Sequence, residues 1–427
     1  MKRLFLLFFG MFYLGSSYAQ NPPIAGYFAD PSIREFDGKY YVYATTDGHE
    51  KFGIGGTPLV WVSDDLVQWT PKKLEGINIE YFWAPAVIKA DNNKFYLYNT
   101  HGVNYTGMVW ESETPIGPWK FKNELVGFDI EPFKDPKTGK FYLTTNSSAL
   151  LELNNDRNSD GYMTEVVASH ELKGVFPDLT EGAYLFYRDG YYYMTWSGGR
   201  CWEDSYRVHY AVSKNIFGPY DYGKNNPVIS SRPEDDIWGP GHHSVLPYKG
   251  KEYLVYHRQD RSHSDWCDFR FLGIAELTFD GKDIKAAKPI DVRKVFGDKR
   301  VNLALNKLVF SGGQAVGHEV AKINDGDYTT RWEGSGYGAY VTIDMGVATE
   351  FSGMDIHMEY PDKYTTFKIE LSDDNQHWQE YENQFTFARK AFAVSSIKKS
   401  GKARFIKIKF ANVEGRKPSI WEWEVWK

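Results

Sequence analysis

The chain has few cysteines, no strong excess of one charge and, beyond its first residues, no long apolar run. Cys201 and Cys267 are the only two cysteines among its 427 residues, too few for a disulfide framework or a thiolate metal site. We expect two buried thiols, with a single disulfide bridge as the alternative. The formal charge is −6, from 50 Lys and Arg against 56 Asp and Glu. This charge balance does not indicate binding to nucleic acid or to an anionic membrane.

The first residues are typical of a secretory signal peptide. Lys2 and Arg3 precede an apolar run over residues 4–14, and a stretch of small residues follows as far as Ala19. The apolar run is shorter than the roughly 20 residues that a membrane span needs. We therefore expect a signal peptide over residues 1–19, cleavage near Ala19 and export to the periplasm or the medium, with no membrane span.

One pattern recurs five times in the first two thirds of the chain: a short apolar stretch, a turn and an aromatic-rich strand. The copies begin 47 to 62 residues apart, at Asp30, Ala84, Glu131, Glu181 and His243. A repeat of roughly 50 residues with about four short strands is typical of a β-propeller. The sequence therefore predicts an all-β fold with a five-bladed β-propeller over residues 20–299. A β-sandwich whose hairpins are similar by chance is the alternative.

The repeat stops after Lys299. Strands that alternate apolar and polar residues follow, as in YVTIDMG at 340–346 and FKIELSDD at 367–374. This alternation predicts a second all-β domain over residues 300–427, a jelly-roll-like β-sandwich.

The start of each copy is a candidate site, because equivalent residues of propeller blades meet around the central axis. Three of the five starting residues are carboxylates: Asp30, Glu131 and Glu181. Crowded carboxylates cost desolvation and repulsion unless they are paired or used. Two of them can hydrolyse a glycosidic bond as acid and base, while a third raises the pKa of the acid by repulsion. The alternative is that each carboxylate caps a turn, as Asp before Pro often does.

Four segments resemble glycoside hydrolase family 43: YFADPSIRE at 27–35, FWAPAVIK at 82–89, LTEGAYLFYRDGYYYMTWS at 179–197 and GPGHHSVL at 239–246. The resemblance implies a five-bladed propeller and an inverting, mostly exo-acting hydrolase of β-D-xylosides and α-L-arabinofuranosides. It implies that Asp30 is the general base that activates water and that Glu181 is the general acid. The family's third carboxylate is usually an Asp before Pro. This chain has Glu131 there, so Glu131 is the expected modulator and Asp129 the alternative.

The same resemblance implies substrate-binding residues. Trp83 is similar to the family's tryptophan beside the sugar, with packing between blades as the alternative. Arg258 is similar to an arginine that contacts the glycone, with a surface salt bridge as the alternative. The family motif Gly-His-x-Ser selects His242 for the axis, whereas the repeat selects His243. We expect one of the two near the axis, and treat His209 and the pair Asp235-Asp236 as surface or loop residues.

The C-terminal segment resembles the discoidin or coagulation-factor type C domain, which overlaps the galactose-binding-like carbohydrate modules. The resemblance is carried by NLALN at 302–306, NDGD at 324–327 and LSDDNQHW at 371–378. The NDGD segment either holds a calcium ion or forms a turn. We expect no catalytic metal and no required cofactor, with a structural calcium ion left open.

These inferences predict an exported exo-glycosidase of plant polysaccharide side chains or oligosaccharides, an α-L-arabinofuranosidase, a β-D-xylosidase or both. Its partner would be a glycan containing arabinose, xylose or galactose, and the protein would act as a monomer. The alternatives are an exo-β-1,3-galactanase of the same fold and a propeller that binds carbohydrate without cleaving it. Hydrolysis of chromogenic glycosides separates these readings.

Overall fold

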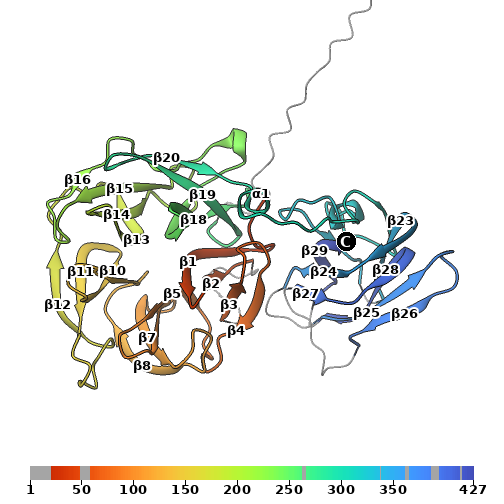
Figure 1. Cartoon of the computed structure of the whole chain (residues 1–427), viewed down its shortest axis with the longest axis horizontal. Coiled ribbons are helices and arrows are strands. Elements are labelled where there is room, and N and C mark those ends of the chain that lie inside the picture. The colour runs from red at the N-terminus through yellow and green to blue at the C-terminus, as the bar shows by residue number, and fades with distance from the viewer. Residues whose placement is uncertain are drawn as a thin grey trace, which may run out of the picture.

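The computed structural model describes residues 21–48, 58–261, 266–336, 338–360, 365–385, 394–413 and 416–427. They form two β domains side by side, joined through the short helix α1 (Val292–Phe296) (Figure 1). The signal peptide expected over residues 1–19 lies outside the described residues. In the described part of the chain, no helix combines the length and the apolar character that crossing a bilayer would require.

The first domain is a ring of five four-stranded antiparallel blades, each built from four consecutive strands. The ring is closed, because β1 contacts both β5 and β17, and β9 and β13 complete the contacts between first strands. The predicted five-bladed propeller is confirmed. Its strands are β1 (Phe28–Phe36), β2 (Lys39–Thr46), β3 (Leu59–Ser63), β4 (Thr70–Lys73), β5 (Phe82–Lys89), β6 (Phe95–His101), β7 (Thr106–Ser112), β8 (Lys120–Leu125), β9 (Glu131–Lys134), β10 (Phe141–Thr145), β11 (Ser147–Leu153), β12 (Val166–Glu171), β13 (Leu179–Arg188), β14 (Tyr191–Gly198), β15 (Arg207–Ser213), β16 (Asp221–Tyr222), β17 (Gly241–Tyr248), β18 (Lys251–Gln259), β19 (Arg270–Asp280) and β20 (Asp283–Pro289).

The aromatic residues fill the spaces between blades. Each pair of neighbouring blades encloses its own apolar cluster, including the pair formed by the fifth and first blades. Between those two blades, Phe28 packs edge-on against Trp61, and Tyr253 joins the same cluster. Large flat side chains on half-buried strands thus hold the blades together.

In every blade the chain bends at one equivalent residue with a positive φ angle, which lies within the first strand or, in the third blade, two residues before it. The five bent residues are equivalent, because two residues after each of them the first strand resumes its pairing with the second strand of the same blade. The resuming pairs are Ser32 with Tyr43, Ala86 with Tyr98, Glu131 with Thr144, Tyr184 with Thr195 and Ser244 with Val255. The five bent positions are Asp30 (51°), Ala84 (43°), Asp129 (54°), Gly182 (58°) and His242 (34°). Non-glycine residues rarely adopt such angles, and strained backbone of this kind clusters at functional sites.

The structural register differs from the one predicted in three blades. In the third blade, Asp129 and not Glu131 stands at the bent position, because the turn between Lys134 and Phe141 spans residues 135–140, whereas the first blade turns over residues 37–38. The longer turn places the strand aromatic Phe141 12 residues after Asp129, whereas Tyr40 follows Asp30 by 10 residues in the first blade. In the fourth and fifth blades the shift is one residue, so the bent residues are Gly182 and His242.

The second domain is the predicted β-sandwich. Its two sheets have the strand orders β21-β23-β28-β25-β26 and β22-β29-β24-β27, and they enclose a core that includes Trp332, Phe367 and Trp423. Its strands are β21 (Leu308–Ser311), β22 (Trp332–Glu333), β23 (Tyr340–Phe351), β24 (Gly353–Met358), β25 (Thr365–Ser372), β26 (Gln379–Asn383), β27 (Val394–Ile397), β28 (Gly401–Val413) and β29 (Ser419–Trp426).

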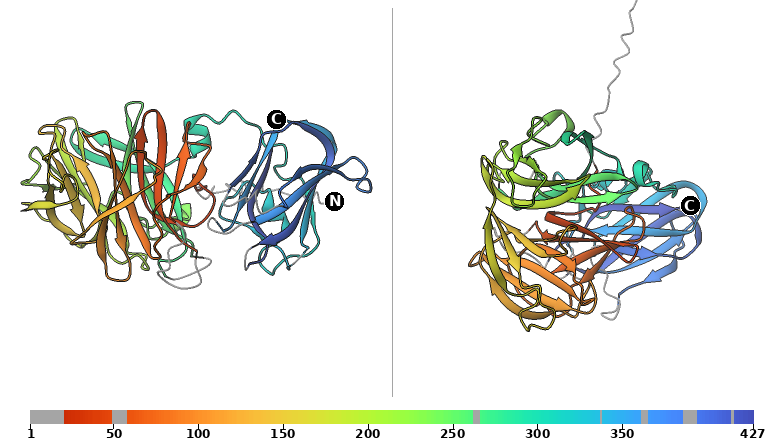
Figure 2. Two further views of the ribbon diagram at one scale, coloured as in Figure 1. Left: turned by 90° about the horizontal axis from the view of Figure 1, so that it is seen from below. Right: turned by 60° about the vertical axis from the view of Figure 1, so that its left-hand side comes forward.

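The two domains lie next to each other (Figure 2). They meet through a small apolar cluster and an ion-pair network. The ring of Tyr27, three residues before Asp30, meets the buried ring of Trp421 edge-on, with 5.1 Å between centroids. Beside it, Arg293 Nη2 lies 2.5 Å from Glu424 Oε1, and His357 Nε2 lies 3.2 Å from Glu424 Oε2. The second domain therefore packs directly on the segment that leads into the first inner strand.

The expectation of two buried thiols is wrong. Cys201 and Cys267 form a disulfide bridge across 66 residues of sequence, with 5.6 Å between their Cα atoms. The bridge joins the loop between β14 and β15 to the loop between β18 and β19. These two loops come together only because blades four and five are neighbours in the ring.

Candidate active site

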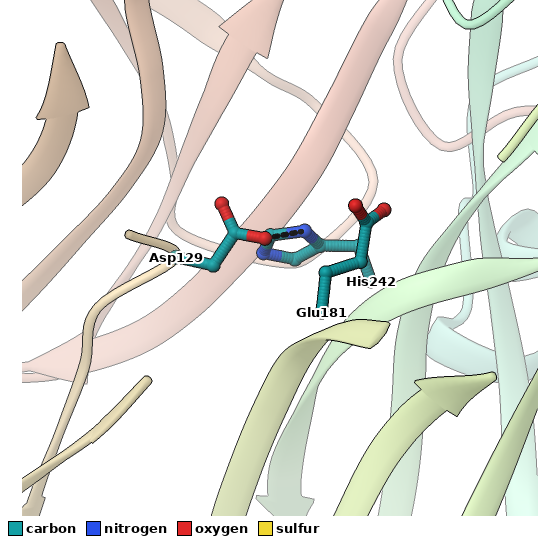
Figure 3. A group of neighbouring side chains, drawn as sticks. All are labelled: Asp129, Glu181 and His242. Atoms are coloured by element: carbon teal, nitrogen blue, oxygen red, sulfur yellow. Dashed lines mark ion pairs between the residues drawn. The ribbon is translucent and has the colours of Figure 1, made fainter. Parts of the chain in front are cut away.

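Three side chains from successive blades meet where the inner strands converge. Asp129, Glu181 and His242 each place one polar atom within 4.8 Å of the others (Figure 3). His242 Nδ1 lies 3.6 Å from Asp129 Oδ2 and 3.3 Å from Asp30 Oδ1. Three carboxylates and one imidazole from four different blades thus form one group, the axial cluster.

Polar side chains from the second strand of each preceding blade hold the bent backbone in place. In four of the five blades a described hydrogen bond runs from the bent residue's backbone N–H to such a side chain. The bonds are Ala84 N to Thr45 Oγ1 (2.8 Å), Asp129 N to Thr100 Oγ1 (2.8 Å), His242 N to Ser197 Oγ (2.7 Å) and Asp30 N to His257 Nδ1 (3.2 Å). The axial cluster is therefore preorganised by the neighbouring blades.

Asp30 is buried and kept ionised. Burial alone would raise the pKa of Asp30, but the Arg270 guanidinium 3.1 Å from Oδ1, followed by His242 and His257, holds this pKa well below its usual value. The hydroxyl of Thr45 donates a hydrogen bond of 2.7 Å to Oδ2. A fixed, ionised carboxylate of this kind suits the general base implied by the family resemblance.

Sequence analysis missed Arg270, because this residue stands on the third strand of its blade, outside the repeated pattern. Strand pairing offers the only signal. Arg270 pairs with Gln259, two residues after His257, so Gln259 and His257 face the same side of the sheet. Arg270 faces this side too, and its guanidinium contacts Asp30 there. The Nε–H of Arg270 donates a hydrogen bond of 2.7 Å to Asp47 Oδ2.

Asp129 has the opposite electrostatic setting to Asp30. Burial, the charge of Glu181 and the charge of Asp30 raise its pKa to about 7, although His242 opposes the shift. The backbone N–H of Gly182 donates to its carboxylate. The cluster thus holds a proton beside an ionised carboxylate.

Glu181 is oriented by a buried tyrosine. The hydroxyl of Tyr206 donates a hydrogen bond of 2.5 Å to Glu181 Oε1, and burial and the charge of Glu181 raise the pKa of Tyr206 well above its usual value. Gly241 makes room for the tyrosine ring, since a Cβ there would lie 1.9 Å from the Tyr206 ring. Tyr206 therefore stays a neutral donor that fixes the position of the Glu181 carboxylate.

Glu131 lies outside the axial cluster as the structure describes it. Its carboxylate forms an ion pair with Arg34 Nη2, and Ser32 Oγ lies 3.4 Å from the same oxygen. The register prediction for Glu131 is therefore corrected, and Asp129, the alternative, occupies the axis. The physical reason is the longer turn of the third blade, which places Glu131 two residues beyond the bend. Its charge is compensated by Arg34, whereas that of Asp129 is exposed to Glu181.

Trp83 lies among aromatic rings at the rim. Its ring meets that of Tyr105 at 5.8 Å, and Tyr105 meets Phe128 at 5.6 Å, both edge-on. Phe82, the preceding residue, is the one that packs between the first and second blades. Trp83 follows Phe82 at the start of β5, directly before the bent residue Ala84. This placement agrees with a ring beside the substrate; the role itself stays a prediction.

Arg258 and His243 point away from the axial cluster. The Arg258 guanidinium is buried and contacts Asp236, with Nη1 3.2 Å from Oδ2. Arg258 follows His257 in β18, and alternate residues of a strand face opposite sides, so it cannot share the side that carries His257 to Asp30. His243 is buried, with Nε2 2.7 Å from Thr195 Oγ1, and burial lowers its pKa to about 3. His242, which the family motif selects, therefore lies at the axis, and the repeat, which selects His243, predicts the wrong residue.

His209 is also corrected, because it is buried and not a surface residue. Its Nδ1 lies 2.9 Å from the Tyr222 hydroxyl, and its ring stacks on Trp196 at 5.6 Å. Burial lowers its pKa to about 4. It is a structural histidine of the fourth blade.

That no catalytic metal is required stays a prediction, and a structural calcium ion stays open in both domains. The two carboxylates and the imidazole of the axial cluster are a donor set that a divalent cation accepts, but the same groups serve acid–base chemistry without one. In the second domain, residues 324–327 form a turn in which Asp325 Oδ1 accepts from Asp327 N at 3.0 Å. The buried Glu422 accepts from Gly326 N at 3.3 Å.

Comparison with known proteins assigns both domains. Residues 19–282 match the model of glycosyl hydrolases family 43, and residues 310–423 match the F5/8 type C domain. The β-D-galactofuranosidase xynD of Aspergillus niger is 27% identical over 286 residues, which are 56% of this chain and 76% of that protein. The β-xylosidase of Bacillus subtilis is 29% identical over 278 residues, which are 56% of this chain and 49% of that protein.

One solved structure, described as a glycoside hydrolase, resembles the fold of nearly the whole chain. Its TM-score is 0.80 at 24% identity, over 95% of this chain and 99% of that one. Curated relatives carry names of β-xylosidases, arabinofuranosidases and a galactofuranosidase. The family model covers more than half of the chain, and the carboxylates of its motifs meet at the axis. The chain therefore belongs to glycosyl hydrolases family 43 and is a glycoside hydrolase.

Proposed function

We propose that the protein is an exported, exo-acting and inverting glycosidase that removes α-L-arabinofuranosyl or β-D-xylosyl residues from plant polysaccharides or their oligosaccharides. One observation carries the proposal. Asp30 is held ionised by Arg270, while the raised pKa of Asp129 keeps a proton in the same cluster, beside Glu181. Inversion needs an ionised base and a protonated acid at the same time.

In the proposed reaction, a water molecule gives a proton to Asp30 and attacks the anomeric carbon. Glu181 gives its proton to the glycosidic oxygen as the bond to the leaving group breaks. Both proton transfers occur in one step, so the product has the opposite anomeric configuration. The charge of Asp129 favours protonation of the Asp129–Glu181 pair before the reaction, and Tyr206 holds the Glu181 carboxylate in position.

The choice of glycone rests on the family resemblance and on the names of the relatives. β-Xylosidase and arabinofuranosidase names are both among them, which supports pentosides as substrates. A galactofuranosidase is also among them, so hexofuranosides belong in any test. The presence of Asp30 speaks against the exo-β-1,3-galactanase alternative, since some relatives of that kind vary at the carboxylate positions.

A panel of nitrophenyl glycosides tests the proposal: α-L-arabinofuranoside, β-D-xyloside, β-D-galactofuranoside and β-D-galactoside. We expect hydrolysis of at least one pentoside, and proton NMR during the first turnovers should show the inverted anomer. Asp30→Asn is the matched control and should be nearly inactive. A folded wild-type protein that hydrolyses none of the four, nor β-1,3-galactan, would support the carbohydrate-binding alternative. Export is tested by N-terminal sequencing of protein from the periplasm or medium, where Gln20 should come first.

A further inference from the structure

Two tryptophans are exposed side by side at one edge of the propeller. Trp202 is 38% exposed and Trp266 is 59% exposed, and their ring centroids lie 6.0 Å apart at an angle of 45°. Each tryptophan adjoins one half of the disulfide bridge, since Trp202 follows Cys201 and Trp266 precedes Cys267. We call Trp202 and Trp266 the tryptophan pair. The outward exposure of two such large apolar rings is costly in water unless a ligand or partner covers them.

The tryptophan pair stands on the rim that carries the axial cluster. The loop over residues 199–206 leaves β14 just after Gly198, which pairs with Leu179, two residues before Glu181. The same loop ends at Tyr206, whose hydroxyl contacts Glu181. The second loop leaves β18 after Gln259, and β18 carries His257 to Asp30. Both loops therefore begin next to residues of the axial cluster.

The pair is fastened and not merely exposed. Besides the disulfide, the side-chain amide of Gln259 donates to the carbonyl of Cys201, and Arg261 forms an ion pair with Asp204. The guanidinium of Arg200 lies 5.5 Å from the centre of the Trp202 ring. A covalent bridge, a buried amide and an ion pair reduce the entropy that the two loops lose when a ligand binds.

We propose that the tryptophan pair binds a pyranose ring on the leaving-group side of the substrate, as in the backbone of xylan. The inference rests on the proposed function, in which Glu181 protonates the leaving-group oxygen. The loop that carries Trp202 ends at Tyr206, which contacts Glu181, so this loop lies on the leaving-group side. The C–H face of a pyranose packs on the electron-rich face of an indole ring. Arg200 supplies donors for the sugar hydroxyls. The pair thus favours long substrates and contributes nothing to a glycoside with a small leaving group.

Kinetics on long and short substrates test the inference. Trp202→Ala and Trp266→Ala are compared with the wild type on xylohexaose, soluble arabinoxylan and the nitrophenyl glycoside that the wild type prefers. We expect kcat/KM to fall about five- to tenfold on whichever long substrate the wild type hydrolyses, which corresponds to about 1 kcal/mol of stacking. The rate on the nitrophenyl glycoside should stay within about twofold. Phe121→Ala, an exposed aromatic on the outer strand β8, is the matched control and should change neither rate.

The bridge is tested with the double variant Cys201→Ser, Cys267→Ser. It should lose part of the preference for long substrates while keeping the rate on the nitrophenyl glycoside. Thermal unfolding shows whether this variant folds, and the tryptophan variants decide the matter if it does not. Equal losses on long and short substrates would show a structural role and overturn the inference, as would tryptophan variants that keep the full rate on the long substrates.

Binding measurements separate failure of the inference from failure of the proposed function. If the wild type hydrolyses no glycoside, its migration in gels containing arabinoxylan or xylan still tests the tryptophan pair. Retardation of the wild type and of Phe121→Ala, but less of Trp202→Ala, would keep the sugar-binding site and reject the proposed reaction. If the wild type hydrolyses the nitrophenyl glycoside and the tryptophan variants lose no activity on polysaccharide, the proposed reaction is kept and the sugar-binding site is rejected.

Discussion

Buried acids occur both at the propeller axis and at the interface between the domains, in contrasting surroundings. At the axis, Asp129 faces Glu181 and Asp30, whose charges raise its pKa. At the interface, Glu424 faces Arg293 and His357 and accepts a hydrogen bond of 3.1 Å from Tyr328. The same residue types thus form a site with a proton to give in one region and a set of compensated charges in the other.

The pKa directions express this difference. Burial raises the pKa of both acids. For Asp129 the neighbouring carboxylates add to the effect of burial, whereas for Glu424 the hydrogen bond of His357 and the charge of Arg293 outweigh it and lower the pKa. Perturbed acids gather at functional sites. Here the acid with the raised pKa, Asp129, lies at the axis, whereas the charge of Glu424 is compensated.

The largest expected effect comes from removing the acid or the base at the axis. Asp30→Asn and Glu181→Gln should each lower kcat on an unactivated oligosaccharide by about 10²- to 10⁴-fold, the usual contribution of acid–base groups. A nitrophenyl leaving group needs less protonation, so it should reduce the loss for Glu181→Gln and not for Asp30→Asn. Steady-state kinetics with purified variants measures both.

Thermal unfolding is the control for these two variants. Their midpoints should stay close to that of the wild type, because both substitutions keep the shape of the side chain. Near wild-type rates in either variant on the oligosaccharide would show that the axial cluster is not the reacting centre.

At the interface, the expected effect is on stability. Trp421→Ala should lower the free energy of unfolding by about 3–5 kcal/mol, as truncation of a buried Trp usually does, because its ring packs on Tyr27 and Phe271. The protein that remains folded should keep its kcat on a small soluble glycoside. Urea unfolding and active-site titration at low temperature separate the two quantities.

A chain that ends at Lys299 sharpens the same comparison. It exposes Tyr27 and Phe271, so we expect it to be less stable than the full chain, with hydrolysis of a small glycoside retained where it folds. A folded truncated chain without activity on that substrate would show that the second domain completes the active site, and would remove the contrast between the two regions.

The pH dependence of the rate distinguishes Asp129 from Glu131. Asp129→Asn removes a negative charge from the Asp129–Glu181 pair, so the remaining acid loses its proton more easily. The alkaline limb of the kcat/KM profile should move to lower pH by about one unit. Glu131→Gln should move it less, because Arg34 already compensates that charge. Movement with Glu131→Gln and none with Asp129→Asn would restore the role that the repeat assigned to Glu131.

The sequence predicted the architecture more securely than the details of the site. Short strands and the spacing of aromatics reveal blades, and motifs identify Asp30 and Glu181 without knowledge of pairing. Glu131 was misplaced because the lengths of turns are not visible until strands are paired. Arg270 was missed because it comes from the third strand, where nothing repeats.

The disulfide shows the same limit. Cys201 and Cys267 are 66 residues apart in sequence, and only the closure of the ring brings their loops together. Contacts within a repeat could be predicted from spacing. Contacts between third strands, loops and neighbouring blades depend on the assembled propeller.

The smallest expected effect concerns stability: Asp129→Asn and Glu424→Gln should change the free energy of unfolding in opposite directions. Asp129 has a raised pKa in the folded protein, so its cost to stability grows as pH rises from about 4 towards 7 and is complete above that range. Asp129→Asn should therefore stabilise the protein at pH 8 by about 1–3 kcal/mol and by much less at pH 5. Glu424 has a lowered pKa, so its contribution is present above about pH 4.3 and is lost as pH falls through the folded value.

Glu424→Gln should accordingly destabilise the protein at pH 8, by about 1–3 kcal/mol for lost hydrogen bonds to a charged group. Urea unfolding of the wild type and of both variants at pH 5 and pH 8 gives the six free energies needed. Because the pKa of Asp129 is raised in the folded protein and that of Glu424 is lowered, the two changes should have opposite signs at pH 8. If Asp129→Asn destabilises the protein equally at both pH values, the Asp129 carboxylate is compensated in the folded protein. The proposed difference between the uncompensated acid at the axis and the compensated acid at the interface would then be wrong.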